Sequence, residues 1–148
     1  MNYNLIRGSI MKITQEVDYA LRVVLYFCKL DYGTKMEARL ISEHEKVPIR
    51  FLLKILRKLT HAKIVNSYRG VNGGYSLAKL PEEIHLNDVI EAIDGPTYVA
   101  KCIGEPEVCN ANRAGKCQLH NTLNKIQNIV SEQLNGITFD DIMNGRVN

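Results

Sequence analysis

The chain has 148 residues, of which 45% are hydrophobic, and a formal net charge of +3. That length allows one compact core with an added helix or two, and it excludes two large domains. No apolar run approaches the roughly 20 residues of a membrane span, and the N-terminus lacks the apolar segment of a signal peptide, so we expect a cytoplasmic protein.

The first ten residues show no periodicity. We expect residues 1–10 to be an extension or disordered, because Met11-Lys12-Ile13-Thr14 looks like a second start. Thr14 is predicted to cap a helix that has Glu16 and Asp18 in its first turns, where acids favour the helix dipole. One face of this helix carries an apolar stripe of Val17, Leu21, Val24, Leu25 and Cys28. We therefore expect Cys28 to be a buried thiol.

Two further helical segments follow at helix-turn-helix spacing. Residues 36–44 have a helical pattern, and only Glu45-Lys46-Val47 separates them from residues 48–59, which begin with a proline. One face of the later segment is apolar, with Phe51, Leu52, Ile55, Leu56 and Leu59. At 100° per residue, the opposite face carries Arg50, Lys54, Arg57 and His61.

A predicted β-hairpin comes next. Residues 64–69 and 75–78 have strand character, and Gly70-Val71-Asn72-Gly73-Gly74 between them permits the positive φ angles of a tight turn. A hairpin after two such helices is a wing. Residues 46–81 contain no Asp or Glu and carry +8, so the remainder of the chain carries −5. A segregated positive field matches a phosphate backbone, and a solvated basic helix is the plainer alternative.

The chain changes character after the wing. Asn87 is expected to cap a short helix over residues 88–93, which Asp94-Gly95-Pro96 ends and which would brace the wing against the core. Residues 97–116 are rich in Gly, Asn, Pro and charge, and we expect a loop there. A helix is predicted from Gln118 to Asn135, and a capping box at Thr138-Phe139-Asp140-Asp141 opens one last short helix.

The long predicted helix has the spacing of a coiled-coil seam, and its seam residues are Leu119, Leu123, Ile126, Val130 and Gln133. We interpret it as a homodimer contact, since paired recognition helices suit paired DNA half-sites. The predicted fold class is mainly α with a small β-hairpin. It comprises a winged helix-turn-helix domain at residues 11–95, a cysteine-rich loop at 96–117, and a dimerisation helix with its tail at 118–148.

Three cysteines and a histidine form the pattern Cys102-x6-Cys109-x7-Cys117-x2-His120. Structural zinc sites normally have two to four residues between paired ligands, and both cysteine intervals here are longer. Wide spacing favours an iron–sulfur cluster, [2Fe-2S] or [4Fe-4S], held by thiolates. His120 lies one helical turn after Cys117 and can supply a fourth ligand. Three cysteines in a polar loop also suit a thiol redox sensor, so both interpretations stay open.

These motifs resemble those of the Rrf-two family of bacterial winged-helix transcription regulators. The resemblance covers residues 11–144 and rests on Met11-Lys12-Ile13-Thr14, Asp18-Tyr19-Ala20-Leu21-Arg22, Arg69-Gly70-Val71-Asn72-Gly73-Gly74-Tyr75, and three cysteines before a long helix. It implies a homodimer whose long helices cross, with DNA contacts from the second helix of the helix-turn-helix and from the wing. Some members complete their cluster with an acid from the partner subunit's first helix, and Asp18 matches that position.

The sequence therefore predicts a DNA-binding transcription repressor that senses iron–sulfur status, nitric oxide or redox state. The DNA contacts are expected from Arg50, Lys54, Arg57, Arg69, Gly70, Asn72, Gly73, Gly74 and Tyr75, and the metal ligands from Cys102, Cys109, Cys117, His120 and Asp18. The alternative is a cluster-free regulator or interaction module that responds to thiol oxidation or to a protein partner. An enzyme is not expected, because His44, His61 and His85 have no nucleophile or carboxylate at telling spacing.

Overall fold

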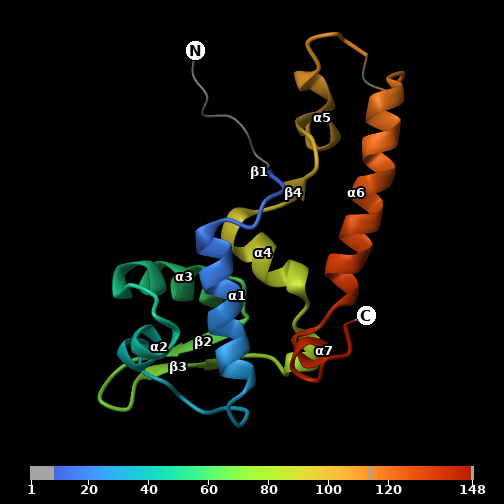
Figure 1. The fold of residues 1–148 in the computed structure, drawn as a ribbon. Helices are drawn as coiled ribbons and strands as arrows, with labels where there is room; N and C mark the ends of the chain where they lie inside the picture. Colours follow the sequence, from blue (N-terminus) through green and yellow to red (C-terminus); the bar gives the residue numbers. More distant parts are fainter. Residues whose placement is uncertain (1–8, 114, 148) are drawn as a thin grey trace.

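The computed structural model describes residues 9–113 and 115–147, and helix α1 (Gln15–Cys28) lies at its centre (Figure 1). Thr14 caps α1 as predicted, because its side-chain oxygen accepts a hydrogen bond from the Val17 N–H at 3.2 Å. Other elements pack on several sides of α1, namely α2, α3, α4 and α7. More of its circumference is therefore buried than the predicted stripe, including Ala20, Val23 and Phe27, while Leu21 and Leu25 are only partly buried.

The helix-turn-helix consists of α2 (Ala38–Glu45) and α3 (Ile49–His61). Lys46 ends α2 in the left-handed conformation, with φ of 55°, and this residue turns the chain toward α3. The first of these helices begins two residues later than predicted. The reason is tertiary, because Met36 exchanges two backbone hydrogen bonds with Tyr75 of the wing, at 2.8 and 2.9 Å.

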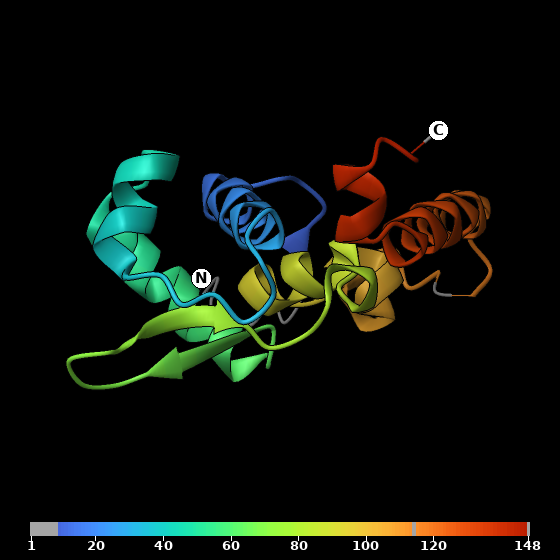
Figure 2. The same ribbon diagram turned by 90° about the horizontal axis from the view of Figure 1, so that it is seen from below.

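The wing consists of β2 (Val65–Tyr68) and β3 (Gly74–Leu77), which pair in antiparallel register from Val65 with Leu77 to Tyr68 with Gly74. Figure 2 shows the hairpin projecting beyond α3 on the side of the molecule away from the long C-terminal helix. Gly74 adopts a φ of 144°, and a Cβ there would come within 2.8 Å of the Met36 carbonyl oxygen. Glycine therefore permits the close approach of residue 36 to the wing.

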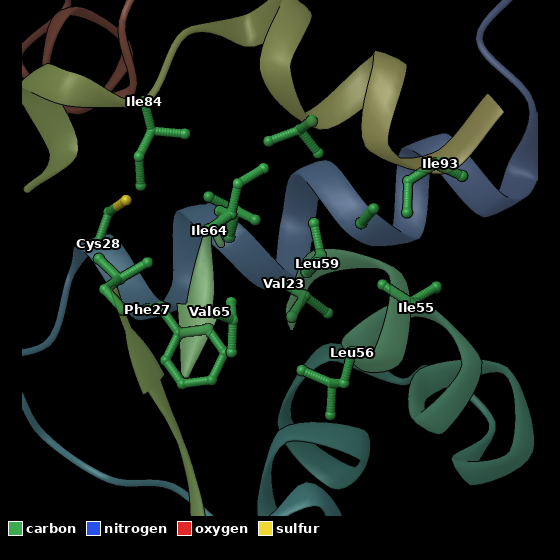
Figure 3. Packing of buried hydrophobic residues seen from close by; sticks show 14 of the residues in the cluster. Val23, Phe27, Cys28, Ile55, Leu56, Leu59, Ile64, Val65, Ile84 and Ile93 are labelled. Atoms are coloured by element: carbon green, nitrogen blue, oxygen red, sulfur yellow. The ribbon is translucent and has the colours of Figure 1, made fainter. Parts of the chain in front are cut away.

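The hydrophobic core lies where α1, α3, the wing and α4 (Leu86–Asp94) meet (Figure 3). Helix α4 follows the short helix η1 (Pro81–Glu83) and begins earlier than predicted. His85 rather than Asn87 precedes it, and the His85 N–H donates to the Asp88 carboxylate at 2.8 Å. α4 packs mainly on α1, α3 and the long C-terminal helix. Its main contacts are therefore with helices, and it meets the wing within the shared core.

Three short elements interrupt the loop that was predicted over residues 97–116. Strand β4 (Thr97–Tyr98) pairs in parallel with β1 (Ser9–Ile10), and α5 (Lys101–Gly104) and η2 (Pro106–Val108) follow. The last two residues of the expected N-terminal extension thus form a strand, and residues 1–8 lie outside the described residues. A two-residue pairing between such distant segments leaves no local pattern in the sequence.

Helix α6 (Gln118–Gly136) confirms the predicted long helix, and α7 (Phe139–Met143) confirms the capping box, because Thr138 and Asp141 bond each other's backbone N–H. Figure 1 shows α6 standing on the far side of the molecule from α2 and α3, next to α5. No helix in the described part of the chain is long and apolar enough to cross a membrane.

Candidate nucleic-acid interface and cysteine site

Helix α3 carries its apolar and cationic side chains on opposite faces. Leu52, Ile55, Leu56 and Leu59 are buried against the core. The face opposite them is exposed and carries Arg50, Lys54, Arg57 and His61. Phe51 is not part of the buried face, because it projects about a quarter turn from its centre and is 52% exposed. The structure thus brings four predicted basic side chains together on one surface.

The wing places only some of its predicted residues at the surface. Arg69, Gly70 and Asn72 are exposed around the tip. Tyr75 is half-buried, packs against the core and holds Met36 through its backbone, so it anchors the wing. Gly73 is also half-buried.

The expected positive φ angle occurs at Gly70 and Gly74 and not at Gly73. Glycine is required at Gly73 for a different reason. A Cβ there would lie 2.7 Å from the Tyr68 carbonyl oxygen and 2.8 Å from the Gly70 carbonyl oxygen. The Gly73 N–H donates to that same Gly70 oxygen at 2.9 Å, which closes the turn.

Each of the three cysteines in the C-terminal half lies on a different short segment. Cys102 is in α5, Cys109 directly follows η2, and Cys117 directly precedes α6. All three are partly exposed free thiols, and His120 is partly exposed in the first turn of α6. Within residues 9–113 and 115–147, the structure does not bring three or more His, Cys, Asp or Glu side chains together in metal-binding geometry.

Cys109 has a distinct environment among these thiols. Hydrogen bonds from the backbone N–H groups of Arg113 and Ala111 lower its pKa, with smaller help from the Asn112 N–H and the Arg113 charge. Donors aimed at a sulfur stabilise the thiolate, which is the form that binds metals and reacts with oxidants. Cys28 is the opposite case, because burial, aided by the charge of Asp140, raises its pKa to about 12.

Asp18 has a neighbour on its own helix. Its carboxylate lies 3.4 Å from the Arg22 guanidinium one turn along α1, and its side chain is about half exposed. Arg22 also lies 3.6 Å from the Glu45 carboxylate at the end of α2. Within one chain, Asp18 therefore belongs to an ion-pair cluster that joins α1 to the helix-turn-helix.

The segment that carries the cysteines has no buried residue of its own. All residues in the ranges 98–113 and 115–126 are at least partly exposed. On α6, Leu119 is 74% exposed and Ile129 is 61% exposed. Apolar side chains at this spacing on an exposed helix are typical of a surface that another body covers.

Three polar side chains make contacts that the sequence did not predict, and these contacts hold α3 against α1 and α4, and β4 against α6. Glu16 forms ion pairs with Lys54 at 3.1 Å and with Lys58 at 2.7 Å, and Lys58 also donates a hydrogen bond to the Ile93 carbonyl at 2.8 Å. Gln127 is buried in α6, where it accepts from the Val99 N–H at 2.8 Å and donates to the Thr97 carbonyl at 3.2 Å. The acid in the first turn of α1 was visible in the sequence, but no pattern indicated its partners.

Comparison with known proteins places this architecture in one family. The family model Rrf2, described as an iron-dependent transcriptional regulator, matches residues 13–145. Protein aau3 of Rhizobium meliloti is 32% identical over 136 residues, which are 92% of this chain and 87% of that protein. The regulator IscR of Aliivibrio salmonicida is 30% identical over 90% of this chain and 77% of its own, and NsrR of Bacillus licheniformis is 28% identical over 90% and 92%.

Solved structures show the same fold. The global cysteine regulator CymR of B. subtilis superposes with a TM-score of 0.69 at 26% identity, over 90% of this chain and 96% of that chain. T. potens IscR has a TM-score of 0.70 at 20% identity, over 93% of this chain and 89% of that chain. A family model that matches nearly the whole chain, together with a winged helix of this shape, shows that the protein belongs to the Rrf2 family of transcriptional regulators.

Proposed function

We propose that this regulator represses transcription as a homodimer that binds double-stranded DNA through α3 and the wing. We further propose that it holds an iron–sulfur cluster on Cys102, Cys109 and Cys117 and senses iron–sulfur status, nitric oxide or redox state. The observation that carries the DNA-binding part is the exposed cationic face of α3, which lies opposite its buried stripe. Membership of a family of regulators supports the prediction that the chain is not an enzyme.

DNA binding follows from what the two exposed elements can contact. A helix of this diameter fits the major groove, where Arg and Lys bond base edges or phosphates. We assign that contact to Arg50, Lys54 and Arg57. The exposed wing tip has Arg69 beside Gly70 and Asn72, and a narrow cationic hairpin suits the adjacent minor groove. Phosphate contacts supply affinity at any sequence, and base contacts supply the preference for an operator.

The donor set of the cysteine segment suits an iron–sulfur cluster. Three free, partly exposed thiols lie on segments that pack as neighbours, since α5 contacts both η2 and α6. The backbone N–H groups around Cys109 favour its thiolate, the form in which cysteine binds iron. When bound, the cluster would supply a centre that reacts with nitric oxide or oxidants. The description of the matching family model as an iron-dependent transcriptional regulator supports this part of the proposal.

The dimer is proposed from the apolar surface of α6. Leu119, Ile126 and Ile129 are exposed, and Leu123 and Val130 are partly buried along the same helix. A second copy of α6 would cover these side chains and leave the two α3 faces pointing outward for two half-sites. Dimers of this kind bind sites one helical turn apart, and repression would follow from occupying a promoter.

The DNA-binding assignment is tested with Arg50→Ala and Arg57→Ala, measured by fluorescence anisotropy with duplex DNA over a range of salt concentrations. A phosphate contact lowers the salt slope by about one, and a base contact costs roughly 1–3 kcal/mol at one position of the operator. Lys29→Ala is the matched control. Lys29 is an exposed cation directly after the C-terminal end of α1, and it is not part of α3 or the wing. Unchanged binding by the double variant Arg50→Ala, Arg57→Ala would show that α3 is not the recognition helix.

The cluster assignment is tested by the visible absorption and iron content of protein purified without oxygen. Iron–sulfur absorption that disappears when Cys102, Cys109 and Cys117 are each replaced by Ser supports it. A colourless protein with a full thiol titre supports the alternative of a cluster-free regulator, for which the lowered pKa of Cys109 is the specific observation. In that case, peroxide should change DNA affinity, and Cys109→Ser should abolish the change.

A further inference from the structure

The carboxylate of Glu16 lies between two lysines of the recognition helix. Its Oε2 is 3.1 Å from the Lys54 Nζ, and its Oε1 is 2.7 Å from the Lys58 Nζ. The two lysines are one helical turn apart on α3, so a single carboxylate reaches both. Only 21% of the Glu16 side chain is exposed. The first turn of α1 thereby places a fixed negative charge against the proposed DNA-binding face.

The two lysines have different surroundings. Lys58 is the more buried of the pair, and its Nζ also donates to the Ile93 carbonyl at the end of α4, so it joins three helices. Lys54 is 56% exposed, and its position along the helix places it on the same face of α3 as Arg50 and Arg57. The contact with Lys58 therefore belongs to the packing of the domain, whereas the contact with Lys54 lies at the surface that DNA would meet.

Glu16 carries a full negative charge at neutral pH. Burial alone would raise its pKa, but hydrogen bonds and charge from Lys58 and Lys54 outweigh burial and hold the pKa below its ordinary value. Its place in the first turn of α1 adds the favourable end of the helix dipole. A DNA phosphate that approached the Lys54 ammonium would meet this carboxylate as a like charge beside the same cation.

We propose that Glu16 competes with DNA phosphate for Lys54 and thereby limits the affinity of the recognition helix. The proposal rests on the proposed DNA-binding function of α3. Lys54 is a flexible point charge with three donors, so it can exchange one anion for the other without a change in the backbone. Lys54 would separate from Glu16 each time the protein binds DNA. The affinity for non-specific DNA would therefore be lower than the cationic face alone would give.

The test replaces Glu16 by Gln, which keeps the size of the side chain and an amide oxygen for Lys58 but removes the charge. Binding is measured by fluorescence anisotropy with a mixed-sequence duplex of about 30 base pairs, long enough for two half-sites one turn apart. We expect E16Q to bind about two- to fivefold more tightly at low salt, in line with the energy of an exposed ion pair. The advantage should shrink as salt screens the carboxylate of the wild type.

Two comparisons make the result specific. Glu91→Gln is the charge-matched control, because Glu91 is exposed on α4, and its contact with the Asn87 amide at 3.0 Å survives the change. In a Lys54→Ala background, E16Q should give no gain. An equal gain in DNA affinity with and without Lys54 would overturn the proposal, because the gain would then come from the change in the protein's net charge and not from release of Lys54. Weaker binding by E16Q would also overturn it and would make Glu16 a residue that positions Lys54.

The measurements distinguish poor folding of a variant from an error in the DNA-binding function proposed for α3. E16Q is checked by thermal unfolding, and the pair E16Q with Lys58→Met removes both charges from the half-buried contact, so its affinity should rise as for E16Q alone. If Arg50→Ala and Arg57→Ala weaken binding while E16Q and the pair leave it unchanged, the competition proposal is wrong and the DNA-binding helix stands. If none of these variants changes binding, the function of α3 itself is wrong.

Discussion

Two neighbouring glycines of the wing are required for different physical reasons. Gly74 combines a φ of 144° with the close approach of the Met36 backbone, whereas Gly73 has ordinary φ and no room for a Cβ between two carbonyl oxygens. The sequence pattern predicted the hairpin correctly, because glycine-rich turns between strand-like segments are local. It did not predict the reason at Gly73, because the approach of backbone atoms from other residues is a property of the folded turn.

Gly73→Val should therefore impair the wing without unfolding the domain. The new side chain would clash with the Tyr68 and Gly70 carbonyl oxygens, which we expect to cost roughly 1–3 kcal/mol and to lower DNA affinity. Circular dichroism and anisotropy measure the two effects. Gly136→Val is the control, since nothing lies within 4 Å of a Cβ built there. If Gly73→Val keeps both wild-type stability and wild-type affinity, the wing does not have this geometry or does not contact DNA.

Glu16 should also leave a signature in the dependence of stability on pH. Its pKa is lower in the folded state than in the unfolded chain, so its contribution to stability is complete above the unfolded pKa and is lost as pH falls through the folded pKa. Urea unfolding of wild type and E16Q from neutral to acidic pH should show a difference in midpoint that declines in acid. A difference that stays constant across this range would mean that the Lys54 and Lys58 contacts do not set the pKa.

Secondary-structure elements show where periodicity succeeds as a predictor and where it fails. α3 and α6 were predicted within two residues of their ends, because their stripes repeat over three or more turns. β4 and α5 were missed, since both are short and depend on contacts with β1 and α6. Gln127 was missed for a related reason. A glutamine in a helix is counted as a surface residue, and only its bonds with Thr97 and Val99 explain why it is buried.

Gln127→Leu should release β4 from α6. Leucine keeps the bulk but leaves the Val99 N–H and the Thr97 carbonyl without the partners that they have in the structure, which we expect to cost about 1–3 kcal/mol. Hydrogen exchange at the Val99 amide, together with urea unfolding, measures this loss. Asn128→Leu, at an exposed position of the same helix outside the predicted seam, serves as the control. Slow exchange at Val99 in the Gln127→Leu variant would show that another contact holds the segment.

At the scale of the whole molecule, the proposed DNA surface and the cysteine segment lie at opposite sides of α1 (Figure 1). A signal at the cysteines must therefore travel through shared elements or across a dimer. The C-terminal end of α4 is one shared element, because the Ile93 carbonyl bonds Lys58 of α3 and the Asp94 carboxylate accepts from Thr14 at 3.0 Å. Thr97 follows three residues later in β4. The sequence contained each of these residues but not their arrangement.

For the proposed cluster, the identity of the fourth ligand would decide whether the site belongs to one subunit or to two. His120→Ala and Asp18→Ala are each reconstituted with iron and sulfide without oxygen, and their absorption and rates of cluster loss are compared. A change only in His120→Ala places the ligands within one subunit, because His120 lies one turn after Cys117 on α6. A change only in Asp18→Ala means that the cluster bridges the dimer through α1.

The remaining outcome also has a structural meaning. If neither substitution changes the absorption, both assignments are wrong and the fourth ligand comes from solvent or a small thiol. Cys28 is a poor candidate in that case, since burial raises its pKa to about 12 and metal binding requires the thiolate. Arg22→Ala is a useful companion to Asp18→Ala, because it removes the 3.4 Å ion pair but keeps the carboxylate.

The anchor that Gln127 provides for the cysteine segment uses main-chain atoms of Thr97 and Val99. No side chain between residues 100 and 117 takes part in those bonds. The length and composition of residues 100–117 can therefore change without loss of the two hydrogen bonds that Gln127 makes with Thr97 and Val99. The segment proposed as the sensor can therefore vary in chemistry while the part proposed to bind DNA keeps its structure.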